Sequence, residues 1–273
     1  MSGTLYVVAT PIGNLEDISL RAVRILREVD LIACEDTRQT RKLLDHYGIE
    51  KAAISYHEHN ERARAEELLR GLQAGKNIAL VSDAGTPLIA DPGYRVVELA
   101  RENGVTVTPV PGPSAMLAAL SASGLPTDSL LFRGFLPPRT AQRRKILEEL
   151  KTMEATLVFY ETPHRILEAL ADIDAVMGER PVVLARELTK IHEEFLRGSA
   201  GELKGILERR PSIKGEFVVM VGKGSGVVEE ETPVEQAVEE LIRQGMPRMD
   251  ALKAVAKRRG LSKREVYKKF DER

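Results

Sequence analysis

Short apolar runs alternate with amphipathic segments through the first 125 residues, and this alternation constrains the fold more than any other feature of the sequence. Apolar runs bounded by turn residues are typical of buried strands, and apolar residues at helical spacing fill the intervals. The predicted strands lie at Leu5–Ala9, Asp30–Cys34, Ala52–Tyr56, Ile78–Ser82 and Val105–Val110. The predicted helices lie at Leu20–Arg27, Arg38–His46, Arg62–Gln73, Tyr94–Glu102 and Ala115–Ala122. Strands separated by helices of this length form βαβ units, so we expect a mainly parallel sheet.

A second alternating block follows a segment rich in Gly, Pro and small polar residues at 121–129, which we interpret as a hinge or domain linker. We expect a shorter, mixed sheet in this block. Its strand-like segments are 130–135, 156–161, 181–187, 193–198 and 216–222. The predicted fold class is α/β, with two α/β domains and a small C-terminal helical domain. The predicted parts are an N-terminal α/β domain at 1–122, a second α/β domain at 123–224, a linker at 225–233 and a helical tail at 234–273.

The helical tail is strongly basic. Its predicted helices are Val234–Arg243, Arg248–Arg259 and Lys263–Phe270. Ser262 and Glu265 form a predicted capping box, and Gly260 lies in the turn of a segment that resembles a helix-turn-helix. Residues 248–273 hold ten Lys and Arg against four Asp and Glu, whereas the rest of the chain holds 30 against 37. This asymmetry indicates a polyanionic partner, with a merely solvated basic helix as the alternative.

Composition excludes several classes of protein. Apolar residues make up 43% of the 273, which is typical of a globular chain with an ample core. No apolar stretch reaches the roughly 18 residues of a membrane-spanning helix, and the N-terminus lacks the apolar region of a signal peptide. Cys34 is the single cysteine, which excludes an internal disulfide and a cysteine-built zinc site. We therefore predict a cytoplasmic protein without a membrane segment.

The predicted strands of the first block end in loops rich in Gly, Pro, Asp and small hydroxyl residues. These loops are TPIGN (10–14), EDTR (35–38), HEHNE (57–61), DAGTPLIADPG (83–93) and PGPSA (111–115). The connections at the opposite edge are ordinary short turns. Ligands of parallel sheets bind beyond the carboxyl ends of the strands, near a topological switch point. One rim of the sheet is therefore predicted to carry a site.

Several polar residues on this rim have a structural explanation beside a functional one. Asp36 or Thr37 is placed to N-cap the next helix, and Asp36 is equally placed to act as a base or to bind a ribose hydroxyl. Ser114 is expected to cap the helix that follows it. His57 and His59 have no evident third ligand, so a solvated loop is favoured over a metal site and we predict no metal.

The strand ends of the second block also carry candidate site residues. FYETPHR (159–165) contributes Tyr160 and Glu161, and ARELTKIHEE (185–194) contributes Arg186 and Glu187. Surface ion pairing is the alternative explanation for the charged members.

Six motifs occur in a fixed order along the chain. They are VATPIGNLEDISLRAV, ACEDTR, VSDAGTPLIADPGY, VPGPSA, FYETPHR and ARELTKIHEEFLRG. In this order the sequence resembles the ribosomal RNA small-subunit methyltransferase I family, a branch of the tetrapyrrole methylase superfamily, from residue 4 to about residue 224. The resemblance implies an enzyme that uses S-adenosyl-L-methionine to methylate the ribose 2′-hydroxyl of a cytidine in the decoding region of small-subunit ribosomal RNA. It also implies a cofactor cleft between the two α/β domains, and a homodimer.

The resemblance further implies that backbone groups of the strand-end loops hold the cofactor. The implied cofactor-binding residues are Ile12, Gly13, Asp83, Ala84, Gly85, Thr86, Pro87, Ile89, Gly112, Pro113, Ser114, Ala115, Tyr160 and Met220. Pro11 stands in a loop that is glycine-rich in the porphyrin-methylating members. This difference argues against a tetrapyrrole acceptor.

Methyl transfer to a ribose hydroxyl also needs groups that position and activate the acceptor. A ribose hydroxyl is a poor nucleophile near neutral pH, so a carboxylate base would help, and Asp36 and Glu187 are the candidates by position. Charged side chains would bind the substrate RNA. The predicted substrate-binding residues are Arg38, Arg186, Glu161 and Arg165, with the basic tail and Arg139, Arg143, Arg144 and Lys145 gripping the RNA.

Two other functions stay open on the residues alone. One is a C-methyltransferase of the same fold that acts on a tetrapyrrole. The other is a nucleic-acid-binding regulator whose tail binds DNA and whose body senses a metabolite.

Overall fold

The computed structural model describes residues 2–224 and 233–271. The predicted linker at 225–233 therefore lies outside the described residues, apart from Pro233. Within these described ranges, no helix is both long enough and apolar enough to cross a membrane.

The first sheet has five strands, as predicted. They are β1 (Thr4–Val8), β2 (Leu31–Cys34), β3 (Ala53–Ser55), β4 (Ile78–Val81) and β5 (Thr106–Val110), in the order β3-β2-β4-β1-β5. Each neighbouring pair runs parallel, which confirms the mainly parallel sheet. Every predicted strand boundary in this block lies within one residue of the observed one.

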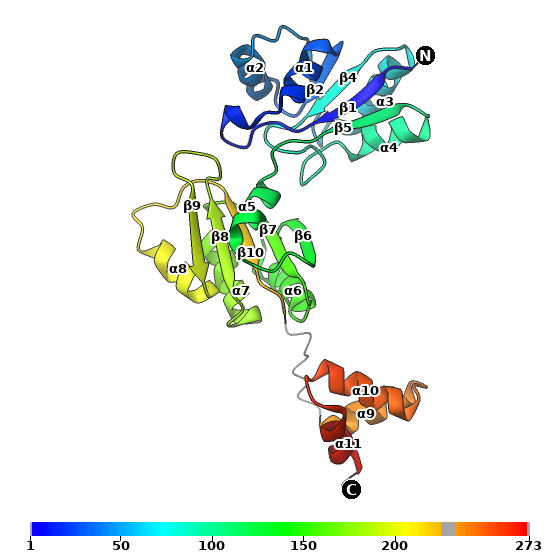
Figure 1. The fold of residues 1–273 in the computed structure, drawn as a ribbon, viewed down its shortest axis with the longest axis vertical. Helices are drawn as coiled ribbons and strands as arrows, with labels where there is room; N and C mark the ends of the chain where they lie inside the picture. The colour runs from blue at the N-terminus through cyan, green and yellow to red at the C-terminus, as the bar shows by residue number, and fades with distance from the viewer. Residues whose placement is uncertain (1, 225–232, 272–273) are drawn as a thin grey trace. The chain divides into compact units, whose positions relative to one another are not determined.

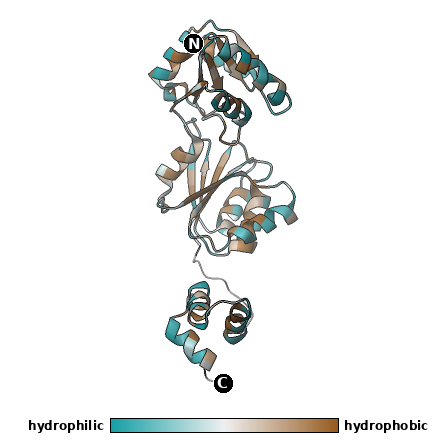
Figure 2. Cartoon of the chain, turned by 90° about the vertical axis from the view of Figure 1, so that its right-hand side faces the viewer, coloured by the Kyte–Doolittle hydropathy of each residue, from teal (hydrophilic) through white to brown (hydrophobic). Residues whose placement is uncertain are grey.

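Helices cover both faces of the first sheet (Figure 1). The helices are α1 (Leu20–Glu28), α2 (Thr37–His46), α3 (Glu61–Gln73) and α4 (Tyr94–Glu102). Successive strand residues point to opposite faces, so Ile32 and Cys34 join the core under α1 and α2, whereas Ala33 joins the core under α3 and α4. Figure 2 shows the hydrophobic residues concentrated on the strands and on the helix faces turned toward them.

The strand order creates a switch point at the centre of the first sheet. The chain leaves β1 to form β2 on one side, and it leaves β4 to form β5 on the other side. Because β1 and β4 are neighbours, the connections that follow them leave in opposite directions along the sheet, which is the arrangement at which ligands of parallel sheets bind. The rim predicted from the sequence therefore contains a switch point.

Helix α5 (Ala115–Ser123) ends the first block. Ser114 occupies its N-cap position but makes no side-chain capping hydrogen bond, so the predicted capping role of that hydroxyl is wrong. Gly124 ends the helix in the left-handed conformation with φ 67°. It also ends the first compact unit, and Leu125 begins the second. The segments Leu184–Phe195 and Gly215–Val218 group with the first unit, which differs from the continuous second domain that the sequence predicts.

The second sheet also has five strands, so the prediction of a shorter sheet is wrong. They are β6 (Leu130–Phe135), β7 (Thr156–Glu161), β8 (Val182–Arg186), β9 (Glu194–Gly198) and β10 (Phe217–Val221), in the order β6-β7-β10-β8-β9. Its helices are α6 (Thr140–Leu150), α7 (Ile166–Met177) and α8 (Ala200–Glu208). β6 and β7 run parallel.

Three helices form the tail and share a core of their own. They are α9 (Val234–Arg243), α10 (Arg248–Arg258) and α11 (Lys263–Asp271). Val238, Val255 and Val266, one from each helix, are at most 1% exposed in this core. The Ser262–Glu265 capping box is present, with each side chain bonded to the other's backbone N–H, as predicted.

Candidate functional site

The loops after β1 and β4 are joined directly at the switch point. Thr10 and Gly85 form an isolated antiparallel bridge, in which each backbone N–H donates to the other's carbonyl oxygen at 2.9 and 3.0 Å. The Thr10 hydroxyl also donates to the carbonyl oxygen of Ser82 at 3.2 Å. The TPIGN turn is therefore held as a short extra strand against the start of the 83–93 loop.

The 83–93 loop is also bonded to the loops after β2 and β5. Asp83 Oδ1 accepts a hydrogen bond from the backbone N–H of Asp36 at 3.0 Å. The Thr86 hydroxyl donates to the carbonyl oxygen of Pro113 at 3.1 Å. Four strand-end loops of the first sheet are thus cross-linked around one segment, which is how a rigid ligand-binding rim is built.

The same segment stores backbone strain. Leu88 and Ala90 adopt positive φ of 72° and 66°, although both carry a side chain, and Gly85 adopts 82°. The other described non-glycine residues with positive φ are Glu187 and Thr189, at 51° and 65°. Strained conformations of this kind persist where the surroundings hold them, and they cluster at functional sites.

Glu61 anchors the far end of the loop, a role that the sequence patterns did not reveal. Its Oε1 accepts hydrogen bonds from the backbone N–H of Gly93 at 3.2 Å and from the Tyr56 hydroxyl at 3.1 Å. A carboxylate at the first position of a helix is ordinarily explained by the helix dipole, so no sequence signal marks this residue.

Three carboxyl groups with raised pKa values belong to this rim. Burial raises the pKa of Asp91 to about 6, and the charge of Glu35 adds to the effect. Partial desolvation raises the pKa of Asp83, and burial raises that of Glu35, with Asp83 contributing repulsion. Asp83 was predicted from the sequence as a site residue, whereas Glu35 and Asp91 were not. The available signal was the position of both residues in the predicted strand-end loops.

Asp36, a predicted base, is engaged in two structural roles. Its carboxylate N-caps α2 by accepting from the backbone N–H of Arg38 at 2.8 Å. It also pairs with the Arg38 guanidinium, with Nη2 2.7 Å from Oδ2. These hydrogen bonds lower the pKa of Asp36 to about 2. The Arg38 side chain is 87% exposed and so remains accessible to a phosphate.

The TPIGN turn packs on the segment after β8. A Cβ on Gly13 would lie 2.5 Å from Lys190 Cγ and 2.9 Å from both the Leu188 carbonyl oxygen and Thr189 Oγ1. Only glycine tolerates this approach, so packing alone accounts for Gly13. Its predicted contact with a cofactor stays a prediction.

Glu187, the second predicted base, lies in a network of its own. Its Oε1 accepts from Lys190 Nζ at 2.8 Å and from the backbone N–H of Glu216 at 3.2 Å. The bond from Lys190 is the main reason that the pKa of Glu187 is lowered. Arg186 beside it pairs with Glu194 at 3.6 Å. Ion pairing, which the sequence left open as the alternative, is therefore present at both residues.

The predicted site residues of the second unit are buried or partly buried. Tyr160 packs edge-on against Phe132, with ring centroids 4.9 Å apart. Glu161 is 2% exposed and pairs with Arg165 at 3.3 Å, while Arg165 also donates to the carbonyl oxygen of Leu136. Met220 is fully buried in β10. The buried Glu161 and Met220 side chains have core roles here.

The remaining predicted cofactor residues lie on the same loops of the first unit. Ile12 approaches Gly85, because a Cβ on that glycine would lie 3.3 Å from Ile12 Cγ2. Gly112 packs on Ala9, because a Cβ on Gly112 would lie 3.1 Å from the Ala9 Cβ. Ala84 and Ile89 are exposed, Pro87 is buried, and Ser114 and Ala115 are partly buried at the start of α5.

Arg143, predicted to grip RNA, is instead part of the core, and that prediction is wrong. The residue is 0% exposed, and its Nε lies 2.6 Å from Asp172 Oδ2. Arg144 bonds the other oxygen of Asp172 at 2.6 Å and remains half exposed. Asp172 signals that some cation is buried, because a carboxylate within an apolar helix needs a cationic partner, but the sequence does not show which of the basic residues that partner is.

His57 and His59 have ring centroids 5.9 Å apart. Across the described residues, no group of three His, Cys, Asp or Glu side chains is arranged to hold a metal ion.

Comparison with known proteins places this site in a family. The model of the Tetrapyrrole (Corrin/Porphyrin) Methylases matches residues 4–204, which include both sheets' first strands and all the cross-linked loops. The chain belongs to the tetrapyrrole methylase family. This membership confirms the fold class predicted from the sequence.

Within the family, the chain is similar over nearly its whole length to two bacterial relatives. Both are named ribosomal RNA small subunit methyltransferase I. The relative from Halalkalibacterium halodurans is 51% identical over 272 residues, covering 97% of this chain and 93% of its own. The relative from Escherichia coli O157:H7 is 48% identical over 269 residues, covering 97% and 94%.

The fold of this chain is also found in a solved structure. Uroporphyrin-III C-methyltransferase from Thermus thermophilus, complexed with S-adenosylhomocysteine, matches with a TM-score of 0.56 at 20% identity. The match covers 81% of this chain and 97% of that protein. At this identity the likeness concerns the fold alone.

Proposed function

We propose that this protein transfers the methyl group of S-adenosyl-L-methionine to the ribose 2′-hydroxyl of a cytidine in small-subunit ribosomal RNA. The observation that carries the proposal is the 51% identity, over nearly the full length of both chains, to a protein named ribosomal RNA small subunit methyltransferase I. The cross-linked loops at the switch point of the first sheet support it, because they form a rigid rim where ligands of such sheets bind.

The residues of the rim fit S-adenosyl-L-methionine. The sulfonium of this cofactor is positively charged, and Glu35, Asp83 and Asp91 give the rim a negative character. The strained 83–93 loop presents backbone groups at Ala84 and Ile89, both of which are exposed. The fourteen cofactor-binding residues that the resemblance implies, of which Ile12 is the first and Met220 the last, remain the proposed binding set.

The bound cofactor supplies an electrophilic methyl carbon attached to a good leaving group. The protein must then align the ribose oxygen with that carbon, exclude water and accept the hydroxyl proton. A base is most effective when its pKa lies near the working pH. Asp91, with a pKa of about 6, meets this requirement better than Asp36, with a pKa of about 2.

The two bases predicted from the sequence receive positioning roles in this proposal. Asp36 holds the exposed guanidinium of Arg38, and Glu187 holds Lys190. Arg38 is then available to bind a phosphate next to the target ribose. We therefore expect Asp36→Asn and Glu187→Gln to lower kcat/KM. Both variants should still lose activity at acidic pH as the wild type does, because the proposed base, Asp91, is unchanged. If either variant no longer lost activity at acidic pH, the residue replaced in that variant would be the base.

The proposed substrate is the RNA within the small subunit, gripped by the basic tail and by exposed cations of the second unit. Arg139, Arg144 and Lys145 are exposed on α6 or at its start. Phosphate contacts of this kind make binding weaken steeply with salt.

We also propose that the enzyme acts as a homodimer in the cytoplasm, where small subunits are assembled. Leu20 and Ile191 are 90% and 97% exposed, and a second copy of the chain would cover such apolar side chains. Sedimentation equilibrium of the full chain tests the dimer, which a single monomer mass would exclude.

The function is tested by following labelled methyl transfer into small subunits from a strain that lacks this gene. Incorporation into the subunit RNA with S-adenosyl-L-methionine as the donor is the expected result. Calorimetric binding of the donor without transfer to subunits or to free RNA would contradict the proposed acceptor. Absence of donor binding would contradict the cofactor.

A further inference from the structure

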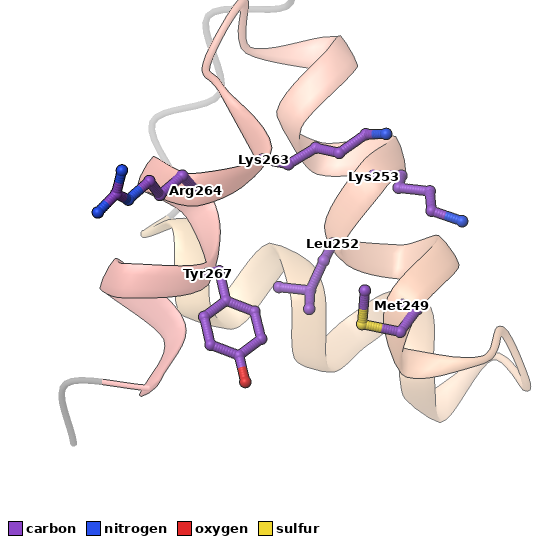
Figure 3. Close-up of a pocket in the computed structure, with 6 residues that line it drawn as sticks. All are labelled: Met249, Leu252, Lys253, Lys263, Arg264 and Tyr267. Carbon is purple, nitrogen blue, oxygen red and sulfur yellow. The ribbon is translucent and has the colours of Figure 1, made fainter.

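The tail contains a pocket that no part of the proposed reaction uses. We call it the tail pocket; it has a volume of about 230 Å³. Met249, Leu252, Lys253, Lys263, Arg264 and Tyr267 line it. Figure 3 shows the Tyr267 ring and the Leu252 side chain at the hollow between α11 and α10, with Met249 beside Leu252.

The apolar part of the tail pocket is open to a ligand. Leu252 is 3% exposed and forms a floor, while Met249 and Tyr267 are 56% and 48% exposed. Phe270, another aromatic residue of the tail, is covered by the Arg248 guanidinium, which lies 5.2 Å from its ring centroid. Tyr267 is therefore the described aromatic ring of the tail that offers a face for stacking.

The rim of the tail pocket is cationic. Lys263 and Arg264 are exposed, and among the described residues neither side chain has a hydrogen bond or an ion pair. Lys253 pairs with Asp250 at 3.0 Å. Glu265, the acidic residue closest in sequence to Lys263, is already engaged with the backbone N–H of Ser262. The charge around the hollow thus favours an anionic ligand.

An apolar floor, one exposed aromatic ring and a cationic rim match one nucleotide of single-stranded RNA. Proteins that bind unpaired RNA stack its bases on aromatic side chains and bind the flanking phosphates with cations. A base-paired nucleotide keeps its faces inside the helix, so it cannot stack on Tyr267. An acidic protein segment would satisfy the cations but would leave the tyrosine ring without a planar partner.

We propose that the tail pocket binds one unstacked base of small-subunit ribosomal RNA against Tyr267, with Lys263 and Arg264 on the flanking phosphates. This inference rests on the proposed function, because it deepens the assignment of ribosomal RNA as the substrate. The tail would then recognise an unpaired nucleotide, in addition to binding polyanions through its charge.

The first test uses a fluorescent reporter. The chain contains no tryptophan, so Tyr267→Trp in the full chain places a single one in the tail pocket. Saturating single-stranded RNA from the small subunit should quench its emission and shield it from acrylamide, whereas a perfect RNA duplex of equal length should not. Gln244→Trp, at an exposed neutral position outside the tail pocket, is the matched control and should stay accessible. Unchanged emission from the Tyr267→Trp variant with RNA bound would overturn the proposal.

The second test uses affinity. Tyr267→Ala should weaken binding to small-subunit RNA about tenfold, since stacking of a base is worth roughly 1–3 kcal/mol, and Tyr267→Phe should restore binding. Lys263→Ala with Arg264→Ala should reduce the slope of log K against log salt by about 1 to 2. Lys257→Ala with Lys269→Ala removes the same charge outside the tail pocket and should cost less affinity. Equal losses in the two double variants, with Tyr267→Ala unchanged, would overturn the proposal.

Methyl transfer by the unmodified chain, measured alongside, separates the two proposals. Active enzyme without quenching in the Tyr267→Trp variant refutes the tail pocket and keeps the function. Quenching by an acidic peptide but not by RNA would assign the tail pocket to a protein partner and refute the inference. An unmodified chain that binds RNA at the tail pocket but transfers no methyl group refutes the function alone.

Discussion

The backbone N–H of Asp36 lies 3.0 Å from Oδ1 of Asp83, so a single hydrogen bond joins the carboxyl ends of β2 and β4. The 83–93 loop is in turn bonded to the loops after β1 and β5 through Gly85 and Thr86. This arrangement makes Asp83 both a structural brace and a negative charge on the proposed cofactor site.

The two roles of Asp83 are separable by substitution. Asp83→Ala removes the brace and the charge, and should lower the free energy of unfolding by about 1 kcal/mol, the usual contribution of one hydrogen bond. Asp83→Asn keeps an oxygen that accepts from the Asp36 N–H, so it should retain stability while weakening S-adenosyl-L-methionine binding. Urea unfolding and calorimetry measure the two quantities. Wild-type behaviour of Asp83→Ala in both would refute the dual role.

Gly13 should not tolerate a side chain. In Gly13→Ala the new Cβ would meet the Leu188 carbonyl oxygen at 2.9 Å, and this backbone atom cannot swing aside as the Lys190 side chain can. Overpacking of this kind costs about 1–3 kcal/mol of stability. Gly205→Ala is the control, because its Cβ meets nothing within 4 Å in α8 and should stabilise the helix by up to about 1 kcal/mol. Equal thermal stability of the two variants would contradict the packing of the TPIGN turn on the segment after β8.

The periodic elements of this chain were predictable, because the signal for each is local. Alternation and helical spacing located β1 to β5 within one residue, since apolar side chains must face a core whatever lies beyond it. The contacts of the candidate site were not predictable in this way. The bridge between Thr10 and Gly85 and the anchoring of Gly93 by Glu61 join residues far apart in the sequence.

Arg143 shows the same limit for single charged residues. The basic pattern of 139–145 indicates an exposed helix face. Arg143 is nevertheless buried, because its guanidinium pairs with Asp172, which lies 29 residues later in the sequence. The pKa of Asp91 likewise depends on burial and on the charge of Glu35, neither of which follows from its place in the 83–93 loop.

The raised pKa of Asp91 predicts a pH-dependent stability difference. Its folded-state pKa of about 6 lies above the ordinary value of 3.8, so its contribution to stability is fully present below pH 3.8 and is lost as the pH rises through about 6. Asp91→Asn removes this ionisation and should be more stable than the wild type at pH 8, by up to about 3 kcal/mol, and similar near pH 4.

Urea unfolding at both pH values checks this expectation. Asp17→Asn, in an exposed 3-10 turn, is the matched control and should show no such pH-dependent gain. A difference between Asp91→Asn and the wild type that is the same at pH 4 and pH 8 would contradict the raised pKa.

The burial of Arg143 predicts that its loss affects folding and not RNA affinity. Arg143→Ala leaves Asp172 buried with one partner, Arg144, and should destabilise the chain by about 3–5 kcal/mol. The double variant Arg143→Met with Asp172→Leu should lose less stability, because it leaves no buried charge without its partner. Lys145→Ala, at an exposed position of the same helix, should leave stability unchanged and weaken RNA binding at low salt. Reduced RNA affinity of a fully folded Arg143→Ala protein would contradict this assignment.

The position of the transferred methyl group distinguishes ribose methylation from methylation of a base. Small subunits from a strain lacking this gene are incubated with the full chain and S-adenosyl-L-methionine that carries a deuterated methyl group, and their RNA is digested to nucleosides for mass spectrometry. We expect one labelled nucleoside, a cytidine with the deuterated methyl group on its ribose. Label on a base, or unlabelled RNA from a chain that binds the donor, would contradict it.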